Sequence, residues 1–539
     1  MDAEVKIFDA NGVQLPFSGN TVSKDILEKS SGKLCISSLI PIVDVVSIWH
    51  PDLLAIAPVK LPWFSLFKCG ATMSYPFFAF LNPMSHVSFA IGLTDQIDDC
   101  HASAKMNQEL CCYEVRFEIA IAPETEPFEI FFDDSKRSLT EVMQSYRDLV
   151  MPQKPVYPAG AWDPVYCSWY AVHAAITDEY LQRNAEEAAR LGFGTFIVDD
   201  GWCFDENKRV TPATLTDWYR DIGDWQWSEN KLPQLEKCVE YAKKLGLNYM
   251  FWVAPFFAGR RSKLAEKAGK YLTELHEGQR IYDPADKAAA DATQESIFAI
   301  FKNMGLDGLK IDFIDTVIPD PDKPHCRVAR NYVEKLVGRI KADNPAALIE
   351  FRQNYATPVN AALATAFRAG DVPFDYMENF NRCMQLRLHL GDGIPIHADP
   401  VYFNNNESVN TVGKHMIASL AGVPMLSMEL SNIAPEHKQV IANYIAFYRE
   451  HRQTLNSGHW FVEIRNGFPT WTKCESIDET IIILTDEAFI DMAVGTCQNS
   501  TFVLNMTPGS FKFGCGQAYD AAGNACGCSA PVGGRLEIL

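Results

Sequence analysis

Acidic residues close several apolar runs in the middle of the chain. Asp199 and Asp200 follow one run, and Asp312, Asp371 and Asp399 each end or follow another. Carboxylates supply the nucleophile, acid and base that cleavage of an acetal requires, and aromatic faces can stack on the apolar face of a sugar ring. Tryptophans lie beside several of these acids in the sequence. The residue types therefore favour chemistry on carbohydrates.

Asp312 is the strongest candidate for a nucleophile. Lys310 lies two residues earlier, so both side chains point to the same face of a strand. A cation there would keep Asp312 ionised, as a nucleophile requires. The alternative is a simple salt bridge at this position.

Asp371 is the second candidate carboxylate, in a loop between Gly370 and Val372. It could equally be a turn or capping residue, and Asp375 is a rival for the same role. Asp199 and Asp200 are adjacent, so a regular strand would turn them to opposite faces. At the twisted end of a strand both could accept hydrogen bonds from sugar hydroxyls.

Other chemistries find little support. The 48 basic and 68 acidic residues give a net charge of −20, which argues against nucleic acid and anionic lipid as partners. There is no GxxxxGK[ST] or GxGxxG motif for a nucleotide cofactor. Ser168 does not stand in a GxSxG elbow. His397 is the only histidine at a predicted strand end, and the cysteines lack paired CxxC spacing, so we expect neither a metal nor a cofactor.

The elements that must position these acids alternate between strands and helices from about residue 153 to 450. Helical patterns follow Thr177 and cover Gln234–Leu245, Thr293–Met304 and Val328–Ile340. Eight alternating units predict parallel pairing and a (β/α)8 barrel, with the acids at the C-terminal ends of the strands. The eight predicted strands are Val165–Tyr170, Thr195–Val198, Leu247–Val253, Gly308–Phe313, Ala347–Phe351, Ala366–Ala369, Ile394–His397 and Val423–Met428.

The flanking segments read as β-structure. Residues 1–152 predict an antiparallel β-sandwich, in which the Phe-rich segment Pro62–Leu81 packs in the core or between domains, or reaches a neighbouring active site. Residues 451–539 predict a small β-domain with strands such as Glu479–Leu484, Met492–Val494 and Thr501–Leu504. The expected architecture is therefore α/β, a central barrel at 153–450 between two β-domains.

The N-terminus lacks a basic segment and an apolar segment, so we expect no secretory signal. No run of 18 apolar residues is present, so we expect no membrane-spanning helix. Together with 15 scattered cysteines, this favours a cytoplasmic protein with mostly buried free thiols. The sequence leaves both a monomer and a homo-oligomer open.

Together these motifs resemble glycoside hydrolase family 36, of the clan of retaining α-galactosidases. The similar segments extend over most of the chain, and the 59-residue interval from Asp312 to Asp371 is close to that between nucleophile and acid in the clan. The segments are SFAIGLTD (Ser88–Asp95), CSWY (Cys167–Tyr170), VDDGW (Val198–Trp202), GDW (Gly223–Trp225), KLP (Lys231–Pro233) and LKID (Leu309–Asp312).

The resemblance implies a role for each matched residue. Asp312 would be the nucleophile, and Asp371 the general acid/base, with a raised pKa in the free enzyme. Asp199 and Asp200 would bind O4 and O6 of a galactose ring, and Lys310 O3 and O4. The other implied substrate contacts are Trp169 and Trp202 as walls of the subsite and Arg368 near O2. Trp252, near the end of the third predicted strand, completes the predicted site.

Two segments depart from the family pattern. EFRQNY (Glu350–Tyr355) replaces a Cys-Ser-x-Gly-Gly stretch, so Arg352 would meet a different C2 group or aglycone, or would pair with a nearby Asp. WVAPFF (Trp252–Phe257) lacks an acidic residue that often precedes the Pro.

The expected activity is a retaining exo-α-galactosidase acting on small oligosaccharides or glycosides. The alternatives are an α-N-acetylgalactosaminidase, a transglycosylase like the raffinose synthases, and a non-catalytic sugar-binding barrel.

Overall fold

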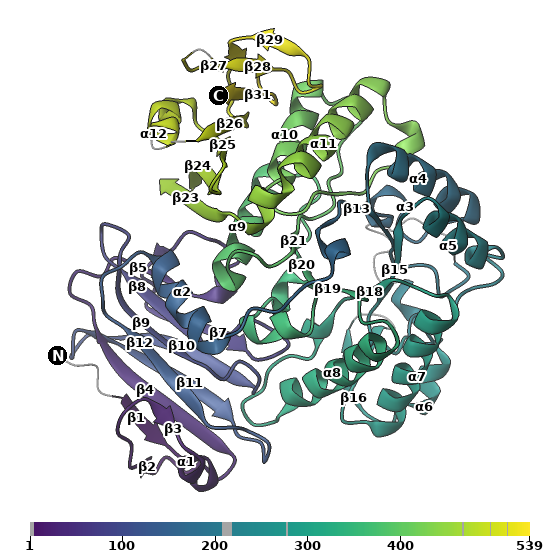
Figure 1. The fold of residues 1–539 in the computed structure, drawn as a ribbon. Coiled ribbons are helices and arrows are strands. Elements are labelled where there is room, and N and C mark those ends of the chain that lie inside the picture. Colours follow the sequence, from purple (N-terminus) through teal and green to yellow (C-terminus); the bar gives the residue numbers. More distant parts are fainter. Residues whose placement is uncertain are drawn as a thin grey trace.

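Three parts follow one another along the chain, from an N-terminal sandwich through a barrel to a C-terminal β-domain (Figure 1). The computed structural model describes residues 5–206, 218–275, 279–465, 468–495, 497, 499–514 and 516–538. Among these residues, no helix combines the length and the apolar character needed to cross a membrane.

The N-terminal part is the predicted sandwich of antiparallel sheets. One sheet has the order β2 (Gln14–Leu15), β1 (Val5–Phe8), β4 (Lys33–Pro41), β11 (Cys112–Ala120), β10 (Cys100–Asn107) and β7 (Phe64–Cys69). The other has the order β3 (Thr21–Val22), β12 (Phe128–Asp133), β9 (Val87–Leu93), β8 (Phe77–Leu81), β5 (Ser47–Trp49) and β6 (Val59–Lys60). Helix α1 (Lys24–Lys29) lies between β3 and β4, and α2 (Leu139–Val150) leads to the barrel.

Strand β8 is buried on both faces, which explains its run of phenylalanines. Phe78 and Phe80 point into the sandwich core, whereas Phe77 packs with Tyr146 of α2 on the side of the barrel. A strand covered on both faces reads as a continuous apolar run. The predicted packing within the core and between domains is therefore confirmed for this strand.

The central part is an eight-stranded parallel sheet that curls into a barrel. Its order is β21 (Ile396–His397), β20 (Ala366–Arg368), β19 (Leu348–Arg352), β18 (Gly308–Ile311), β15 (Asn248–Val253), β14 (Thr195–Val198), β13 (Val165–Cys167) and β22 (Met425–Leu426). The isolated parallel bridges His397–Val423 and Val401–Leu426 join the two ends of this sheet. All eight predicted strands are present, and the predicted barrel is confirmed.

Helices surround the barrel: α3 (Trp169–Val172), α4 (Asp178–Leu191), α5 (Leu235–Lys244), α6 (Lys263–Lys267), α7 (Lys287–Asn303), α8 (His325–Asp343), α9 (Tyr376–Leu390), α10 (Val409–Ser419) and α11 (Pro435–Ser457). A hairpin of β16 (Tyr271–Leu275) and β17 (Gln279–Tyr282) is inserted before α7. Thr177 caps α4 as predicted by accepting from the Tyr180 amide. Helix α7 begins earlier than predicted because the Asp286 side chain accepts from the amides of Ala288 and Ala289.

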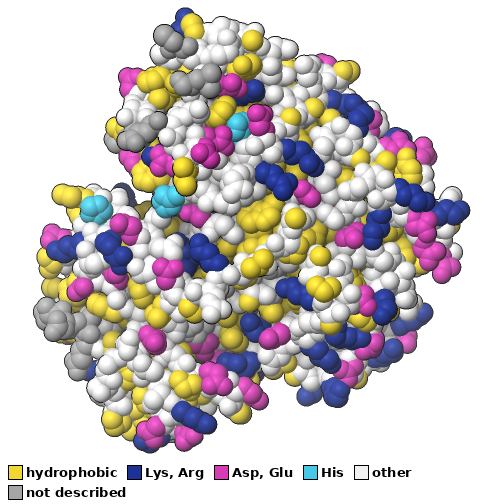
Figure 2. All heavy atoms as spheres, viewed as in Figure 1, with side chains coloured by type: hydrophobic (Ala, Val, Ile, Leu, Met, Phe, Trp, Pro, Cys, Tyr) yellow, Lys and Arg dark blue, Asp and Glu magenta, His cyan; other side chains and the backbone are white. Residues whose placement is uncertain are grey.

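The segment between α2 and β13 crosses the barrel on the face seen in Figure 1. The backbone oxygen of Ala161 in this segment contacts Nε2 of His397 at 3.1 Å. Hydrophobic side chains gather near the centre of the same face, and Lys and Arg are interspersed with Asp and Glu around them (Figure 2). Gly160 of the same segment lies against Asn248 and Leu348, the first residues of β15 and β19, so the linker covers the N-terminal ends of these strands and leaves the C-terminal ends for the acids.

The C-terminal part is a β-domain, and its described residues form one parallel pair of strands. Its main sheet has the order β23 (His459–Arg465), β24 (Phe468–Glu475), β25 (Glu479–Leu484), β26 (Ser500–Asn505), β31 (Arg535–Ile538), β28 (Gln517–Tyr519) and β29 (Ala525–Gly527). β27 (Phe511–Lys512) pairs with β30 (Ser529–Ala530).

The strand predicted at Met492–Val494 is wrong, because these residues lie in helix α12 (Ile490–Val494). β25 and β26 are parallel, and parallel neighbours need a crossover connection, which is usually helical. The predicted domain boundary at 450 falls inside α11, so the division at 152 and 450 remains a proposal.

Candidate active site

A cavity of about 180 Å³ opens at the C-terminal ends of the barrel strands. Most of the predicted site residues line it: Trp169, Asp199, Asp200, Trp252, Lys310, Asp312, Arg368 and Asp371. The sequence analysis did not single out four others, namely Tyr170, Tyr219, Phe313 and Pro400. Acidic, basic and aromatic groups thus meet in a space that suits one small polar ligand.

Asp312 follows β18 and is held by two donors. Its Oδ2 accepts from the indole Nε1 of Trp252 at 3.1 Å, and its Oδ1 accepts from the Phe313 amide at 2.9 Å. Burial alone would raise the pKa of Asp312, but the nearby cations, Arg352 first and then Lys310, outweigh it and lower the pKa. The carboxylate is therefore buried, oriented and ionised.

The residue after Asp312 has an unusual backbone. Phe313 has a φ of 56°, in the left-handed region that costs a β-carbon residue energy. Its ring packs against Phe257 at 5.1 Å and Trp252 at 6.2 Å between ring centres. This packing holds the turn that aims Asp312 at the cavity.

Lys310 differs from the prediction in its direct partner. Its Nζ donates to Oδ2 of Asp199 at 2.6 Å, and both side chains are buried. Cys167 Sγ donates to the same oxygen at 3.2 Å, and Ser168 Oγ accepts from the Asp199 amide at 2.9 Å. Lys310 thus fixes Asp199 directly, and acts on Asp312 through its charge rather than through a contact.

Asp371 lies at the cavity mouth with its side chain half exposed. Arg352 Nη2 donates to its Oδ2 at 2.6 Å, and Arg368 Nη1 donates to its Oδ1 at 2.9 Å. Partial burial acts to raise the pKa of Asp371, but Arg368 and then Arg352 overcome it and lower the pKa to about 2. The expected raised pKa is therefore wrong for the free protein, in which both carboxylates are ionised.

Arg352 joins the two carboxylates. Besides Asp371, it approaches Oδ1 of Asp312 to 3.7 Å through Nη1, and its guanidinium lies over the Phe313 ring at 5.1 Å. Of the two predicted roles, the structure shows the pairing of Arg352 with a nearby Asp. The side chain is largely buried, at 16% exposed.

Asp399 and Tyr170 form a further set beside Arg368. Asp399 Oδ2 accepts from Tyr170 Oη at 3.1 Å and from the Val372 amide at 2.8 Å, and its Oδ1 accepts from Arg368. Burial raises the pKa of Asp399 to about 7 despite the Arg368 cation. Its position two residues after the seventh strand was the sequence signal for this group.

Glu350 and His397 lie deeper in the barrel. His397 Nδ1 contacts Glu350 Oε2 at 2.6 Å, and both side chains are buried. Arg368 Nε lies 3.8 Å from Glu350 Oε1. The Glu350–His397 pair therefore supports Arg368 from inside the barrel.

Two predicted residues lie elsewhere. Trp202 is fully buried and donates from Nε1 to the backbone oxygen of Trp252, so it supports the wall formed by Trp252 and is not among the residues that line the cavity. Asp375 accepts from the Glu378 amide at 3.0 Å and caps α9. A capping role explains Asp375 without any part in the chemistry.

Comparison with known proteins gives one consistent result. The model of the Melibiase family matches residues 126–332. Alpha-galactosidase 1 of Pediococcus pentosaceus is 20% identical over 402 residues, which cover 68% of this chain and 51% of that protein. Alpha-galactosidase AgaA of Geobacillus stearothermophilus is 32% identical over 101 residues, or 19% of this chain and 13% of that protein. The chain thus spans about half the length of the first relative.

Solved structures show the same fold. The GH36 α-galactosidase AgaA from Geobacillus stearothermophilus, in complex with 1-deoxygalactonojirimycin, has a TM-score of 0.66 at 15% identity, covering 94% of this chain and 77% of that chain. The α-galactosidase TtGalA of Thermus thermophilus, in complex with p-nitrophenyl α-D-galactopyranoside, has a TM-score of 0.56 at 17% identity, covering 83% and 95%.

These relatives and structural neighbours are α-galactosidases, and so glycoside hydrolases. The fold is that of the GH36 enzymes, and the resemblance to glycoside hydrolase family 36 is confirmed.

Proposed function

We propose that the protein is a retaining exo-α-galactosidase that releases terminal α-galactosyl residues from small oligosaccharides or glycosides. The observation that carries this proposal is the ionised Asp312 at the end of β18, oriented by Trp252 and facing a cavity that also holds Asp371. The similarity to α-galactosidases gives the sugar class. One solved relative holds stachyose, an α-galactosyl oligosaccharide.

The proposed reaction has two steps. Asp312 attacks the anomeric carbon, the bond to the leaving oxygen breaks, and that oxygen takes a proton from Asp371. Asp371 then removes a proton from water, which attacks the glycosyl-enzyme and releases galactose with the original anomeric configuration. Because Asp371 is ionised in the free protein, it must gain a proton as substrate enters and weakens its contacts with Arg352 and Arg368.

The polar end of the cavity supports recognition of one sugar ring. Asp199, fixed by Lys310, and the adjacent Asp200 both line the cavity. Carboxylates accept hydrogen bonds from hydroxyls, so this pair suits O4 and O6 of a galactose ring, with Lys310 near O3 and O4. Trp169 and Trp252 supply apolar faces in the same cavity. The small volume favours a terminal residue over an internal one.

A panel of aryl α-glycosides tests this function: galactoside, N-acetylgalactosaminide, glucoside and uronide, with wild type beside Asp312→Asn. Turnover of the galactoside by wild type and its loss in a folded Asp312→Asn variant is the expected result. Preference for the N-acetylgalactosaminide would contradict the galactosidase assignment. It would indicate that the segment around Arg352 recognises the substituent at C2. Transfer to an added sugar in place of hydrolysis would identify a transglycosylase.

One observation favours a second candidate, a sugar-binding barrel without turnover. Two arginines hold Asp371 ionised, and an ionised carboxylate cannot serve as a general acid. The same panel separates the two candidates. Galactose binding measured by calorimetry, with no turnover of any glycoside, would support the binding protein.

A further inference from the structure

An exposed aromatic side chain stands on the loop that leaves Asp371. Phe374 lies three residues after Asp371 and is 70% exposed. Its ring packs edge-to-face on Tyr402, with 5.5 Å between ring centres and 80° between ring planes. Pro400, two residues before Tyr402, lines the cavity, as does Asp371. The two rings therefore belong to segments that border the cavity on the side of Asp371.

The loop that carries Phe374 is pinned at two points. The Val372 amide donates to Oδ2 of the buried Asp399 at 2.8 Å, and the Tyr402 amide donates to the Pro373 oxygen at 3.3 Å. Proline restricts the backbone between these bonds further. The ring is thus presented to solvent from a fixed backbone, so that little conformational entropy would be lost when a ligand packs on it.

The chemistry of the site indicates which part of the substrate would contact the Phe374 ring. A general acid must contact the leaving oxygen, so the leaving group lies beside Asp371. The cavity suits a single sugar ring, so the next ring of the substrate must lie outside it, at the rim. A sugar or aryl ring presents an apolar face, and aromatic side chains bind such faces.

We propose that Phe374, backed by Tyr402, is the platform on which the ring of the leaving group packs, and that it sets the preference for the aglycone. This inference rests on the proposed function and on Asp371 as the acid. It assigns a specificity-determining role to a residue outside the cavity that holds the galactosyl ring.

The test compares two substrates in the Phe374→Ala variant. α-Galactosyl fluoride has no ring in its leaving group, whereas an α-galactosyl disaccharide has one. We expect kcat/KM for the disaccharide to fall about 3- to 10-fold, mostly through KM, and that for the fluoride to stay within about 2-fold. Phe374→Tyr should retain most of the wild-type value with both substrates.

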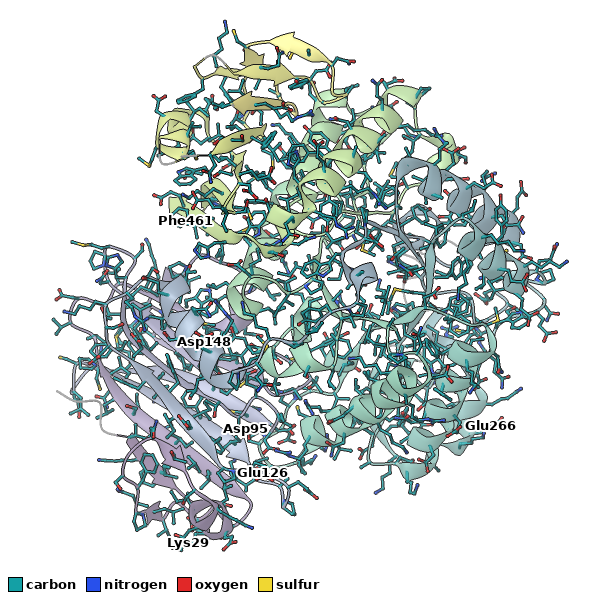
Figure 3. The ribbon with its side chains drawn as sticks, viewed as in Figure 1. Lys29, Asp95, Glu126, Asp148, Glu266 and Phe461 are labelled. Atoms are coloured by element: carbon teal, nitrogen blue, oxygen red, sulfur yellow. The ribbon has the colours of Figure 1, made fainter. Side chains whose placement is uncertain are left out.

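Phe461→Ala is the matched control. Phe461 on β23 is also an exposed phenylalanine, 41% exposed, and packs on Trp471 with 5.2 Å between ring centres. It lies in the C-terminal domain, on the side nearest the N-terminal sandwich (Figure 3). Removal of this ring should leave kcat/KM for both substrates unchanged.

Two results would overturn the inference while the proposed function stands: equal losses with both substrates, which indicate a structural role, or no loss with either. If wild type turns over neither substrate, the proposed function fails and this inference fails with it.

Discussion

The guanidinium of Arg352 joins the two carboxylates of the site, at 2.6 Å from Asp371 Oδ2 and 3.7 Å from Asp312 Oδ1. This cation suits Asp312, which has to be ionised to attack. It opposes the role of Asp371, which has to be protonated to act as an acid. Loss of the Arg352–Asp371 contact on substrate binding would resolve this conflict and raise the pKa of Asp371 when the proton is needed.

Replacing Arg352 with glutamine should move the pH profile of kcat/KM towards alkaline pH. A neighbouring cation lowers a carboxyl pKa, so its removal raises the pKa of Asp371, and the acid form persists to higher pH. We expect the alkaline limb to shift up by about one pH unit. The acidic limb should also shift up, because the pKa of Asp312 rises as well.

The control is Arg339→Gln, which removes a cation paired with Glu295 on the barrel exterior. Its pH profile should match that of wild type. An unchanged profile in Arg352→Gln would show that Arg352 does not set the protonation of Asp371 in the working enzyme.

Trp252→Phe should slow the reaction by removing one donor to Asp312. The indole Nε1 is 3.1 Å from Asp312 Oδ2, and a hydrogen bond to the ionised form favours that form. We expect kcat to fall roughly 10-fold and the acidic limb to move up, since phenylalanine keeps the apolar wall but not the donor. An unchanged acidic limb would mean that this bond does not tune Asp312.

Asp371→Ala should distinguish substrates by their leaving groups. A good leaving group needs little protonation, so a dinitrophenyl α-galactoside should retain much of its first-step rate, whereas a disaccharide should lose about 100-fold or more. Asp375→Ala is the control, because Asp375 caps α9 and should cost about 1 kcal/mol of stability with little effect on activity. If Asp375→Ala lost activity on the disaccharide and Asp371→Ala did not, Asp375 would be the general acid.

Asp98→Ala should weaken the attachment of the sandwich to the barrel. The buried Asp98 carboxylate pairs with Arg327 of α8 through both oxygens, at 2.6 and 2.8 Å, and Thr125 also donates to it at 2.5 Å. Removing one partner of a buried ion pair costs roughly 3–5 kcal/mol, measured by denaturant unfolding. The exposed pair Arg339–Glu295 is the comparison, and Glu295→Ala should lower the free energy of unfolding far less, because solvent screens this pair. Equal effects would contradict a special role for the buried pair.

The fold was largely predictable because alternating strands and helices impose parallel pairing. Even the short strands at Ile396–His397 and Met425–Leu426 were found from their place in the series. The helix at Ile490–Val494 was missed because five residues hold little more than one helical turn of pattern. The helix is explained by the parallel pairing of β25 with β26, because parallel neighbours need a crossover connection.

The composition of the site was also predictable, but not its electrostatics. Strand-end positions place Asp199, Lys310 and Asp312 in the cavity. The sequence contains no signal for which cation contacts which acid, because Arg352 and Asp371 are 19 residues apart and meet only through the barrel. For the same reason the sequence analysis predicted that Trp202 lines the cavity. In the structure Trp202 lies behind Trp252 instead.

Covalent trapping of the glycosyl-enzyme tests the central claim most directly. A fluorinated α-galactoside that reacts with the nucleophile faster than its adduct hydrolyses would be incubated with wild type and with Asp312→Asn, followed by peptide mass spectrometry. The account predicts one fluorogalactosyl group on the peptide that contains Asp312, and none on the variant. A label on another residue, or no label in an enzyme that turns over α-galactosides, would contradict it.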